Sequence, residues 1–292
     1  IHYFDPHGPY HPPPRFRPPG TAPEKIGNGI HARKDFRKAR SRTERTWVKG
    51  LYLGEVSWVD ENVGMVLEKL VDLGIYDESL IILTSDHGEE FWDHRRFEHG
   101  HSLYDELIHV PLLVKLPRSM GDELRGETGA LFSGCSDESY LHVKRPEVVS
   151  TTSIMPTILD LVGIEGHDET LASQSLVPLL STRPPVVDKK SHVVSSGLLY
   201  GKQKQSVVFQ GMKYILCPEN GRDWLFDLSK DPGEQKSIAG KNHDLVQKAQ
   251  DLLQAHEQFS QAIREKYRIG DGEEAEIDEE TLEELRALGY VI

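Results

Sequence analysis

Ser79-Leu80-Ile81-Ile82-Leu83-Thr84-Ser85-Asp86-His87-Gly88-Glu89-Glu90 carries the strongest structural signal in this 292-residue chain. The apolar run at 80–83 has no polar alternation, which is typical of a strand buried on both faces of a parallel α/β sheet. The run ends in a carboxylate and an imidazole, Asp86 and His87, where open α/β sheets place their functional groups. Both side chains bind divalent metals, so a metal site is predicted, although Asp-His-Gly alone also fits an ordinary polar loop.

The composition predicts an ordered, acidic protein. Hydrophobic residues make up 37% of the sequence, enough for a folded core. The formal net charge of −13 argues against non-specific binding to nucleic acids, and no apolar run reaches the ~20 residues of a transmembrane segment. The two cysteines, Cys135 and Cys217, lack the spacing of a zinc site or a disulfide framework. Because the chain begins at Ile1 within what reads as a strand, we expect a fragment that lacks its natural N-terminus.

The hydrophobic pattern predicts helices and strands followed by a small sheet. Apolar residues recur at helical spacing over 47–73, a strand is predicted at 110–116, and residues 148–161 read as an extended stretch that turns into a helix. We expect an α/β domain over residues 1–185, with its N-terminal part missing, and a C-terminal α+β subdomain over residues 186–292. In that subdomain, an antiparallel sheet and a helix are predicted at 192–195, 205–209, 213–216, 224–228 and 244–262.

Histidines gather at the ends of the predicted strands. Eight of the 14 fall in three places: His2, His7 and His11, then His87, then His94, His99, His101 and His109. Packing alone does not explain imidazoles at each strand end, whereas acids, bases and ligands are common there. We therefore predict a functional role for at least two of these histidines, while His109 and His192 are predicted to be ordinary core histidines.

A basic stretch precedes the first predicted helix. Its cations are Arg33, Lys34, Arg37, Lys38, Arg40, Arg42 and Arg45. The simpler interpretation is a solvated helix face or loop. The alternative is a collar that attracts an anionic substrate, because clustered positive charge raises the local concentration of anions.

Five motifs occur in an order that resembles the sulfatase family of the alkaline-phosphatase-like superfamily. They are DPHGPY at 5–10, LTSDHGEE at 83–90, HGHSLYDE at 99–106, SIMPTILDLVG at 153–163 and LFDL at 225–228. Each motif is weak alone, but their order over nearly the whole chain is specific. The resemblance implies an α/β fold with a mostly parallel sheet flanked by helices, and a small C-terminal antiparallel-sheet subdomain plus a helix.

The resemblance also implies roles for individual residues. Asp86 and His87 match the second pair of metal ligands, and His7 matches the histidine that contacts the sulfate or the leaving-group oxygen. Many sulfatases carry a lysine between the positions of His99 and His101, where this chain has glycine. One of these two histidines is expected to take over the cationic role, with His99 preferred. The expected catalytic residues are thus His7, His99 and His101, of which His7 and His99 also bind substrate.

One divalent metal ion is the implied cofactor. The resemblance favours Ca²⁺, but His87 stands where many sulfatases have asparagine, and an imidazole also suits Mn²⁺, Mg²⁺ or Zn²⁺. The family's nucleophile is a formylglycine made from the Cys or Ser of a C/S-x-P-x-R motif. Neither Cys135 nor Cys217 lies in such a motif, and no S-x-P-x-R occurs among the 292 residues. We therefore expect this chain alone to be catalytically incompetent.

Three hypotheses for function follow from these residues. The first is the C-terminal part of a metal-dependent sulfuric ester hydrolase, with a small-molecule or saccharide sulfate ester as substrate. The second is a phosphonate or phosphate mono/diester hydrolase of the same superfamily, which His87 and the missing lysine favour. The third is a catalytically inactive binding module, whose ligand binding would need neither a metal nor the pair Asp86 and His87.

Overall fold

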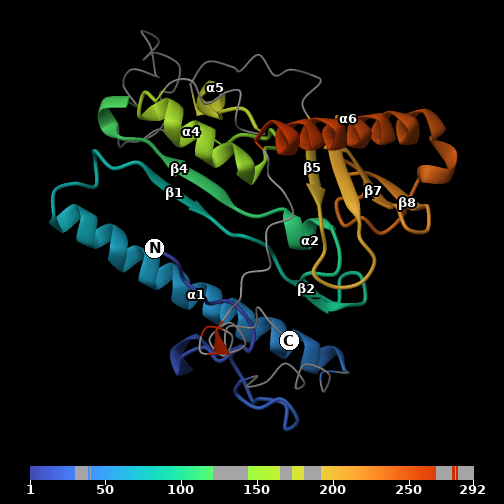
Figure 1. Cartoon of the computed structure of the whole chain (residues 1–292). Helices are drawn as coiled ribbons and strands as arrows, with labels where there is room; N and C mark the ends of the chain where they lie inside the picture. The colour runs from blue at the N-terminus through green and yellow to red at the C-terminus, as the bar shows by residue number, and fades with distance from the viewer. Residues whose placement is uncertain are drawn as a thin grey trace.

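The computed structural model describes residues 1–29, 39, 41–120, 144–164, 173–180, 192–267, 278, 279 and 281. Figure 1 shows a long helix and a two-stranded ribbon, followed by short helices and a four-stranded sheet beside a second long helix. No helix among the described residues is both long and apolar enough to cross a membrane. The predicted boundary between residues 185 and 186, the position of Cys135 and most of the basic stretch lie outside the described residues.

The first long helix, α1 (Arg42–Asp72), anchors the N-terminal loop. Ser41 begins a capping box, in which its hydroxyl accepts from the N–H of Glu44 and the Glu44 carboxylate accepts from the N–H of Ser41. Trp47 and Leu51, on the buried face of α1, belong to one hydrophobic cluster with Tyr10 of the loop. The helix predicted for this part of the chain is confirmed. It begins earlier than its apolar periodicity indicates, because the polar capping box sets the first turn.

Short elements connect the longer ones. Before α1, the 3₁₀-helix η1 (Pro14–Phe16) packs against it. Between α1 and residue 120 lie β1 (Ile81–Thr84), β2 (Glu90–Phe91), β3 (Phe97–Glu98), α2 (Asp105–Ile108) and β4 (Leu112–Lys115). The next described segments hold η3 (Thr151–Ser153), α4 (Ile154–Leu161) and α5 (Val177–Leu180). The predicted strand at 110–116 and the helix within 148–161 are thus confirmed.

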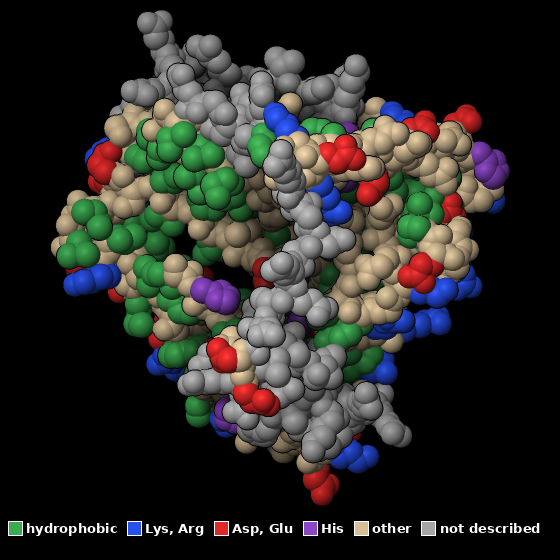
Figure 2. All heavy atoms as spheres, viewed as in Figure 1, with side chains coloured by type: hydrophobic (Ala, Val, Ile, Leu, Met, Phe, Trp, Pro, Cys, Tyr) green, Lys and Arg blue, Asp and Glu red, His purple; other side chains and the backbone are tan. Residues whose placement is uncertain are grey.

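The strand predicted at 80–83 is β1, and it pairs with β4 in an antiparallel two-stranded sheet. The expected mostly parallel sheet is not confirmed, because every strand pair in the described part of the chain is antiparallel. Nor are both faces covered: Leu83 is 37% and Leu113 58% exposed. In Figure 2, hydrophobic side chains gather in the left half of the view, over the region where Figure 1 draws β1 and β4. The apolar run therefore predicts a strand correctly. The prediction that this strand is buried on both faces is not confirmed, because no described residues pack over the exposed face.

The C-terminal part is an antiparallel sheet packed against a helix. Its strands follow the order β5-β6-β7-β8, with β5 (His192–Ser196), β6 (Gln205–Phe209), β7 (Met212–Cys217) and β8 (Arg222–Asp227). After η4 (Ala239–Lys241), helix α6 (His243–Tyr267) lies along the sheet (Figure 1). Val207, Tyr214 and Leu225 of the sheet form a buried core with Ala249 and Leu253 of α6. The predicted small sheet with a final helix is confirmed.

A buried ionic cluster joins this sheet to α2. The Nζ atom of Lys213, in β7, lies 2.6 Å from Asp105 Oδ1 and 2.9 Å from Glu234 Oε1. Lys213 is fully buried and Glu234 nearly so, and the backbone N–H of Asp105 donates to Glu234 Oε2 (2.6 Å). Buried charges require such partners. The cluster therefore fixes α2, and the turn that precedes it, against the C-terminal sheet.

Candidate active site

The turn after β1 presents Asp86 and His87 to solvent, with side chains 72% and 37% exposed. Ser85 Oγ donates to the carbonyl oxygen of His87 (2.6 Å), and the N–H of His87 donates to Asp86 Oδ1 (2.9 Å). Gly88 comes so close to α2 that a Cβ there would lie 2.1 Å from the carbonyl oxygen of Glu106. Because only glycine permits this approach, Gly88 locks the turn beyond the strand end.

Three of the predicted histidines come together at this turn. The rings of His87 and His99 stack with their centroids 3.9 Å apart and an angle of 27° between the planes. The centroid of His7 lies 5.2 Å from that of His99 and 6.4 Å from that of His87. The N-terminal loop, the turn after β1 and the segment after β3 therefore meet at one point, although they are distant in sequence.

A carboxylate holds His99 in place. His99 Nδ1 lies 3.0 Å from Glu89 Oε1, and the side chain of Glu89 is only 5% exposed. The hydroxyl of buried Tyr10 donates to Glu89 Oε2 (2.6 Å). Burial, together with the charge of Glu89, raises the pKa of Tyr10, so this phenol stays protonated. Since an ionised carboxylate only accepts hydrogen bonds, Nδ1 of His99 carries a proton and Nε2 is the nitrogen left for chemistry.

His7 is held by its own loop. Its Nδ1 lies 2.7 Å from the carbonyl oxygen of Gly8, so Nδ1 carries a proton and Nε2 is available to a ligand. The ring of Phe4 packs against it with centroids 4.6 Å apart. Burial lowers the pKa of His7, and the neighbouring His99 and His87 lower it further. The free site therefore favours a neutral imidazole at this position.

His101 lies in a separate, buried pair. It is 7% exposed, with Nε2 2.9 Å from Glu90 Oε2 and Nδ1 3.2 Å from the carbonyl oxygen of His99. Glu90 is fully buried and also accepts backbone hydrogen bonds from His94 and Arg96. Burial alone would raise the pKa of Glu90, but its hydrogen bonds, first that of His101, leave this pKa lowered. Both ring nitrogens of His101 are engaged, which favours a positioning role over the catalytic role that its motif implies.

The C-terminal sheet holds the same turn from the other side. The backbone N–H of Tyr200 donates to the carbonyl oxygen of Gly100 (2.8 Å), and Lys204 Nζ donates to that of His101 (3.0 Å). Gly100 has a φ of +80°, and a Cβ there would lie 3.0 Å from the Cβ of Leu199. The positive φ of Gly100 and the lack of room for a Cβ both favour glycine at this position. The loop between β5 and β6 thus holds residues 99–101 in place.

Asp86 and His87 have the chemistry of two ligands of one divalent ion. Asp86 Oδ2 and His87 Nε2 lie 3.7 Å apart, which fits the ~3–4 Å span of two donors bonded to one ion at about 2.0–2.2 Å. His87 Nδ1 lies 2.8 Å from the carbonyl oxygen of Gly88, a contact that leaves Nε2 free for a metal. Among the described residues, no group of three or more His, Cys, Asp or Glu side chains is arranged to hold an ion. The pair therefore fits part of a metal shell.

Two residues of the site have no assigned role in the sequence-based interpretation. Tyr10 and Glu89 stand in the motifs DPHGPY and LTSDHGEE, so a signal for each is present. Their contact joins positions 79 residues apart, which motif spacing does not reveal. The contacts of Tyr200 and Lys204 have no local sequence signal, because they depend on how the C-terminal sheet sits against the turn.

The sequence of the chain also matches a known family. The model of the sulfatase family matches residues 1–164, more than half of the 292 residues. The chain belongs to the sulfatase family. In this chain, His7, Asp86, His87 and His99 all lie inside the matched region, so the imidazole cluster is in the part that carries the family pattern.

Named relatives agree with the family. Arylsulfatase K of Mus musculus is 29% identical to this chain over 205 residues, which cover 66% of this chain and 32% of the relative. N-acetylglucosamine-6-O-sulfatase of Bacteroides thetaiotaomicron is 26% identical over 236 residues, which cover 77% of this chain and 37% of the relative. The chain thus spans about a third of the length of these relatives.

Solved structures show the alkaline-phosphatase-like fold. A protein in complex with its substrate D-glucosamine-2-N,6-O-disulfate superposes with a TM-score of 0.55 and 23% identity, over 83% of this chain and 47% of that one. The phosphonate monoester hydrolase of Agrobacterium radiobacter superposes with a TM-score of 0.55 and 21% identity, over 82% of this chain and 45% of that one. At this level of identity the likeness establishes the fold, which sulfatases and phosphonate hydrolases share.

Proposed function

We propose that this chain forms the leaving-group side of a metal-dependent sulfuric ester hydrolase. The observation that carries the proposal is the meeting of His7, His87 and His99 at one strand end, with His99 held by Glu89. Cleavage of a sulfate ester places negative charge on the leaving oxygen, and a positioned donor there lowers the barrier. The 292 residues contain no C/S-x-P-x-R motif, so the proposal assigns the nucleophile to a part of the enzyme beyond them.

In this proposal His99 is the general acid. Glu89 orients its ring and stabilises the imidazolium, while Nε2 gives its proton to the leaving oxygen. Such a transfer contributes typically ~10²–10⁴-fold to the rate. His7 takes up a proton when the anionic ester binds, because the ester's charge offsets the effect of the neighbouring imidazoles. It then donates a hydrogen bond to a sulfate or leaving-group oxygen.

Asp86 and His87 would bind one side of the divalent ion. The exposed carboxylate and the free Nε2 support this assignment, as does the contact that fixes the imidazole tautomer. When bound, the ion supplies positive charge that polarises a sulfate oxygen. Calcium is the ion expected for the family, and the imidazole also accommodates Mn²⁺, Mg²⁺ or Zn²⁺.

Sulfated saccharides are the proposed substrate class. One relative bears the name N-acetylglucosamine-6-O-sulfatase, and one structure of the same fold holds D-glucosamine-2-N,6-O-disulfate. A sugar alkoxide is a poor leaving group, so a site with a carboxylate-held imidazole suits this chemistry.

A phosphonate or phosphate ester hydrolase is the second candidate. His87, where many sulfatases have asparagine, favours it, and the fold is also that of a phosphonate monoester hydrolase. Relative rates on N-acetylglucosamine 6-sulfate, an aryl sulfate, an aryl phosphate and an aryl phosphonate separate the two. The protein to assay is the form that the native gene encodes, with and without a metal chelator.

Fast, chelator-sensitive release of sulfate supports the first proposal, and a preference for phosphonate or phosphate supports the second. Absence of turnover, with ligand binding that survives Asp86→Ala and His87→Ala together, would leave a binding module. Robust turnover by the 292-residue chain alone would contradict the assignment of the nucleophile to another part of the enzyme.

A further inference from the structure

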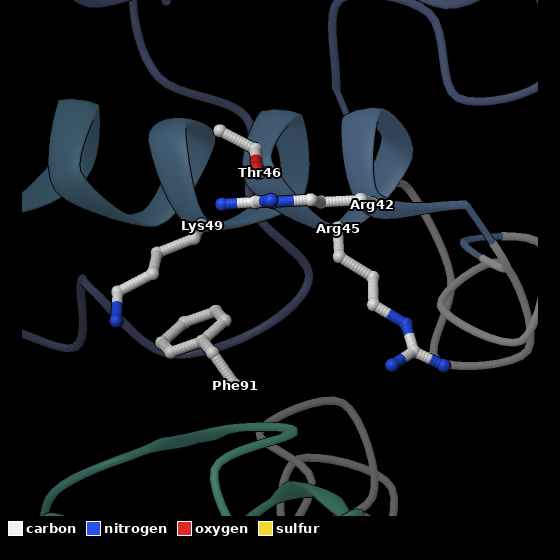
Figure 3. Close-up of a pocket in the computed structure, with 5 residues that line it drawn as sticks. All are labelled: Arg42, Arg45, Thr46, Lys49 and Phe91. Carbon is white, nitrogen blue, oxygen red and sulfur yellow. The ribbon is translucent and has the colours of Figure 1, made fainter.

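A cationic cleft lies between the start of α1 and β2. Arg42, Arg45, Thr46, Lys49 and Phe91 line it, and its volume is about 240 Å³. In Figure 3, Arg45 and Lys49 extend from α1 toward the level of Phe91, while Arg42 lies along the helix beside Thr46. Residues three, four and seven positions apart share one face of a helix, so the sequence itself gathers the three charges. They are a local exception in a chain with a formal net charge of −13.

The three cations have no carboxylate partner in the described part of the chain. Among those residues, neither Arg42, Arg45 nor Lys49 forms an ion pair. Arg15 is a useful contrast, because it also lies over an aromatic ring but is paired with Glu61. Like charges at helical spacing repel one another and destabilise the helix. An anion that binds between them would remove this repulsion.

Aromatic rings lie directly under two of the cations. The guanidinium carbon of Arg45 is 4.9 Å from the centroid of the Trp92 ring, and Lys49 Nζ is 5.6 Å from that of Phe91. Trp92 has a φ of 65°, a left-handed conformation that is strained for a bulky side chain. Cations beside half-buried rings match a ligand that has both anionic groups and an apolar C–H face. A sulfated sugar has both.

The cleft and the imidazole cluster are joined by one short stretch. Phe91 stands two residues after Glu89, a spacing of ~7 Å along an extended chain. The ring of Phe91 packs near that of Tyr10, with centroids 6.1 Å apart, and the hydroxyl of Tyr10 donates to Glu89. A short saccharide can therefore contact both the cleft and the imidazole cluster.

We propose that this cleft, lined by Arg42, Arg45, Thr46, Lys49 and Phe91, binds a second anionic group of a sulfated saccharide. This group is distinct from the ester cleaved at the imidazole cluster, and the inference rests on the proposed function. One water molecule takes up ~30 Å³ in the liquid, so the cleft of about 240 Å³ is several times larger than a water. It has room for one sulfate or carboxylate group with part of a sugar ring. The negative charge of the whole chain disfavours a long nucleic acid lying across the surface.

Calorimetric titration of the 292-residue chain tests the proposal without turnover. The probe is a fully sulfated heparin hexasaccharide, with the desulfated hexasaccharide as the ligand control. The test variant is Arg42→Gln with Lys49→Gln, which keeps the side-chain stems and removes two charges. Arg15→Gln is the matched control, because its cation also stacks on a ring but is already paired. Loss of two charge-assisted contacts is expected to weaken binding of the sulfated probe by about 10–100-fold.

The outcomes separate clearly. Weakened binding in the double variant, with Arg15→Gln within about twofold of the wild type, supports the cleft. Unchanged binding in the double variant, or equal weakening by Arg15→Gln, would overturn it. Full competition by a single-stranded oligonucleotide of equal charge would also overturn it, because the cleft would then recognise polyanions in general.

Measuring turnover by the native protein distinguishes a failure of this inference from a failure of the proposed function. Active enzyme should show a raised KM and an unchanged kcat for the hexasaccharide in the double variant, with both constants unchanged for N-acetylglucosamine 6-sulfate. Sulfate release with an unaltered hexasaccharide KM would overturn the cleft and leave the hydrolase intact. Cleft-dependent binding without any sulfate release would instead count against the hydrolase.

Discussion

His99 Nδ1 lies 3.0 Å from Oε1 of Glu89, and this contact defines which nitrogen of the imidazole can react. Glu89 is itself fixed from the other side by the hydroxyl of Tyr10. The carboxylate stands in the same short motif as Asp86 and His87, so one turn after β1 supplies two candidate metal ligands and the residue that orients the candidate acid. The predictions below test this arrangement and the packing that supports it.

Replacement of Glu89 by glutamine should slow catalysis while leaving the fold intact. The amide can still accept a hydrogen bond from His99, but it no longer stabilises the imidazolium. Loss of such an orienting partner typically costs about 10–100-fold in activity. Glu68→Gln, at an exposed position of α1, is the control, and an unaltered kcat in Glu89→Gln would contradict the orienting role.

The buried cluster around Lys213 should matter more for stability than an exposed ion pair of similar length. Lys213→Met leaves Asp105 and Glu234 without their cation, and such a change costs about 3–5 kcal/mol. Lys230→Met is the matched control: its Nζ lies 2.7 Å from Asp227, but the Lys230 side chain is 83% exposed. Exposed ion pairs contribute little to stability, because water and salt screen them. Urea unfolding of the two variants measures the difference, and equal losses would contradict the importance of burial.

Glu55 should make the protein less stable as the pH rises. It is 3% exposed, and burial raises its pKa to about 8, while the N–H of His11 donates to its carboxyl group. Because the folded pKa is raised, the stabilising contribution is complete below the unfolded pKa of about 4.5. It is lost as the pH increases toward 8, by an amount on the order of a few kcal/mol.

Chemical denaturation between pH 5 and pH 9 checks this expectation. Glu55→Gln removes the titrating group, so its free energy of unfolding should fall less steeply over this range than that of the wild type. Glu68→Gln, an exposed position on the same helix, should retain the wild-type slope. Parallel pH profiles for the wild type and Glu55→Gln would show that Glu55 is ionised in the folded state.

Adding a side chain at Gly88 should destabilise the protein. In Gly88→Ala the new Cβ would meet the Glu106 carbonyl oxygen at 2.1 Å, and the backbone must move to relieve this overlap. Overpacking of this kind costs about 1–3 kcal/mol. In Gly64→Ala, in the middle of α1, the Cβ meets nothing within 4 Å, so the better helix propensity of alanine should stabilise by about 0.5–1 kcal/mol. Thermal unfolding distinguishes the two signs, and a neutral Gly88→Ala would contradict the close approach.

The sequence is most informative where local chemistry determines structure. Helix α1 follows from its periodicity, and the four-stranded sheet follows from short apolar segments separated by turns. The Asp86–His87 turn follows from a strand that ends in polar residues. These features depend on neighbouring residues, which a single sequence displays directly.

The remaining features depend on distant contacts. The motif HGHSLYDE offers two candidate imidazoles and only a slight preference for His99. The fold separates them, because His99 lies beside His87 and His101 beside Glu90. The apolar character of β1 predicts a strand but not its antiparallel partner, because both kinds of sheet accept such residues. The link from Lys213 to Asp105 spans 108 residues and has no local signature.

The most direct test of the central proposal is the leaving-group dependence of His99→Ala in the native protein. Sulfate release is measured from N-acetylglucosamine 6-sulfate, whose sugar oxygen needs a proton, and from 4-nitrophenyl sulfate, whose nitrophenolate leaves without one. His109→Ala is the control, because this imidazole is 79% exposed. The predicted core position of His109 and His192 is therefore wrong, since both residues lie at the surface. We predict a loss of about 10²–10⁴-fold on the sugar sulfate and less than about tenfold on the nitrophenyl ester. Equal losses on both substrates, or none on the sugar sulfate, would contradict His99 as the general acid.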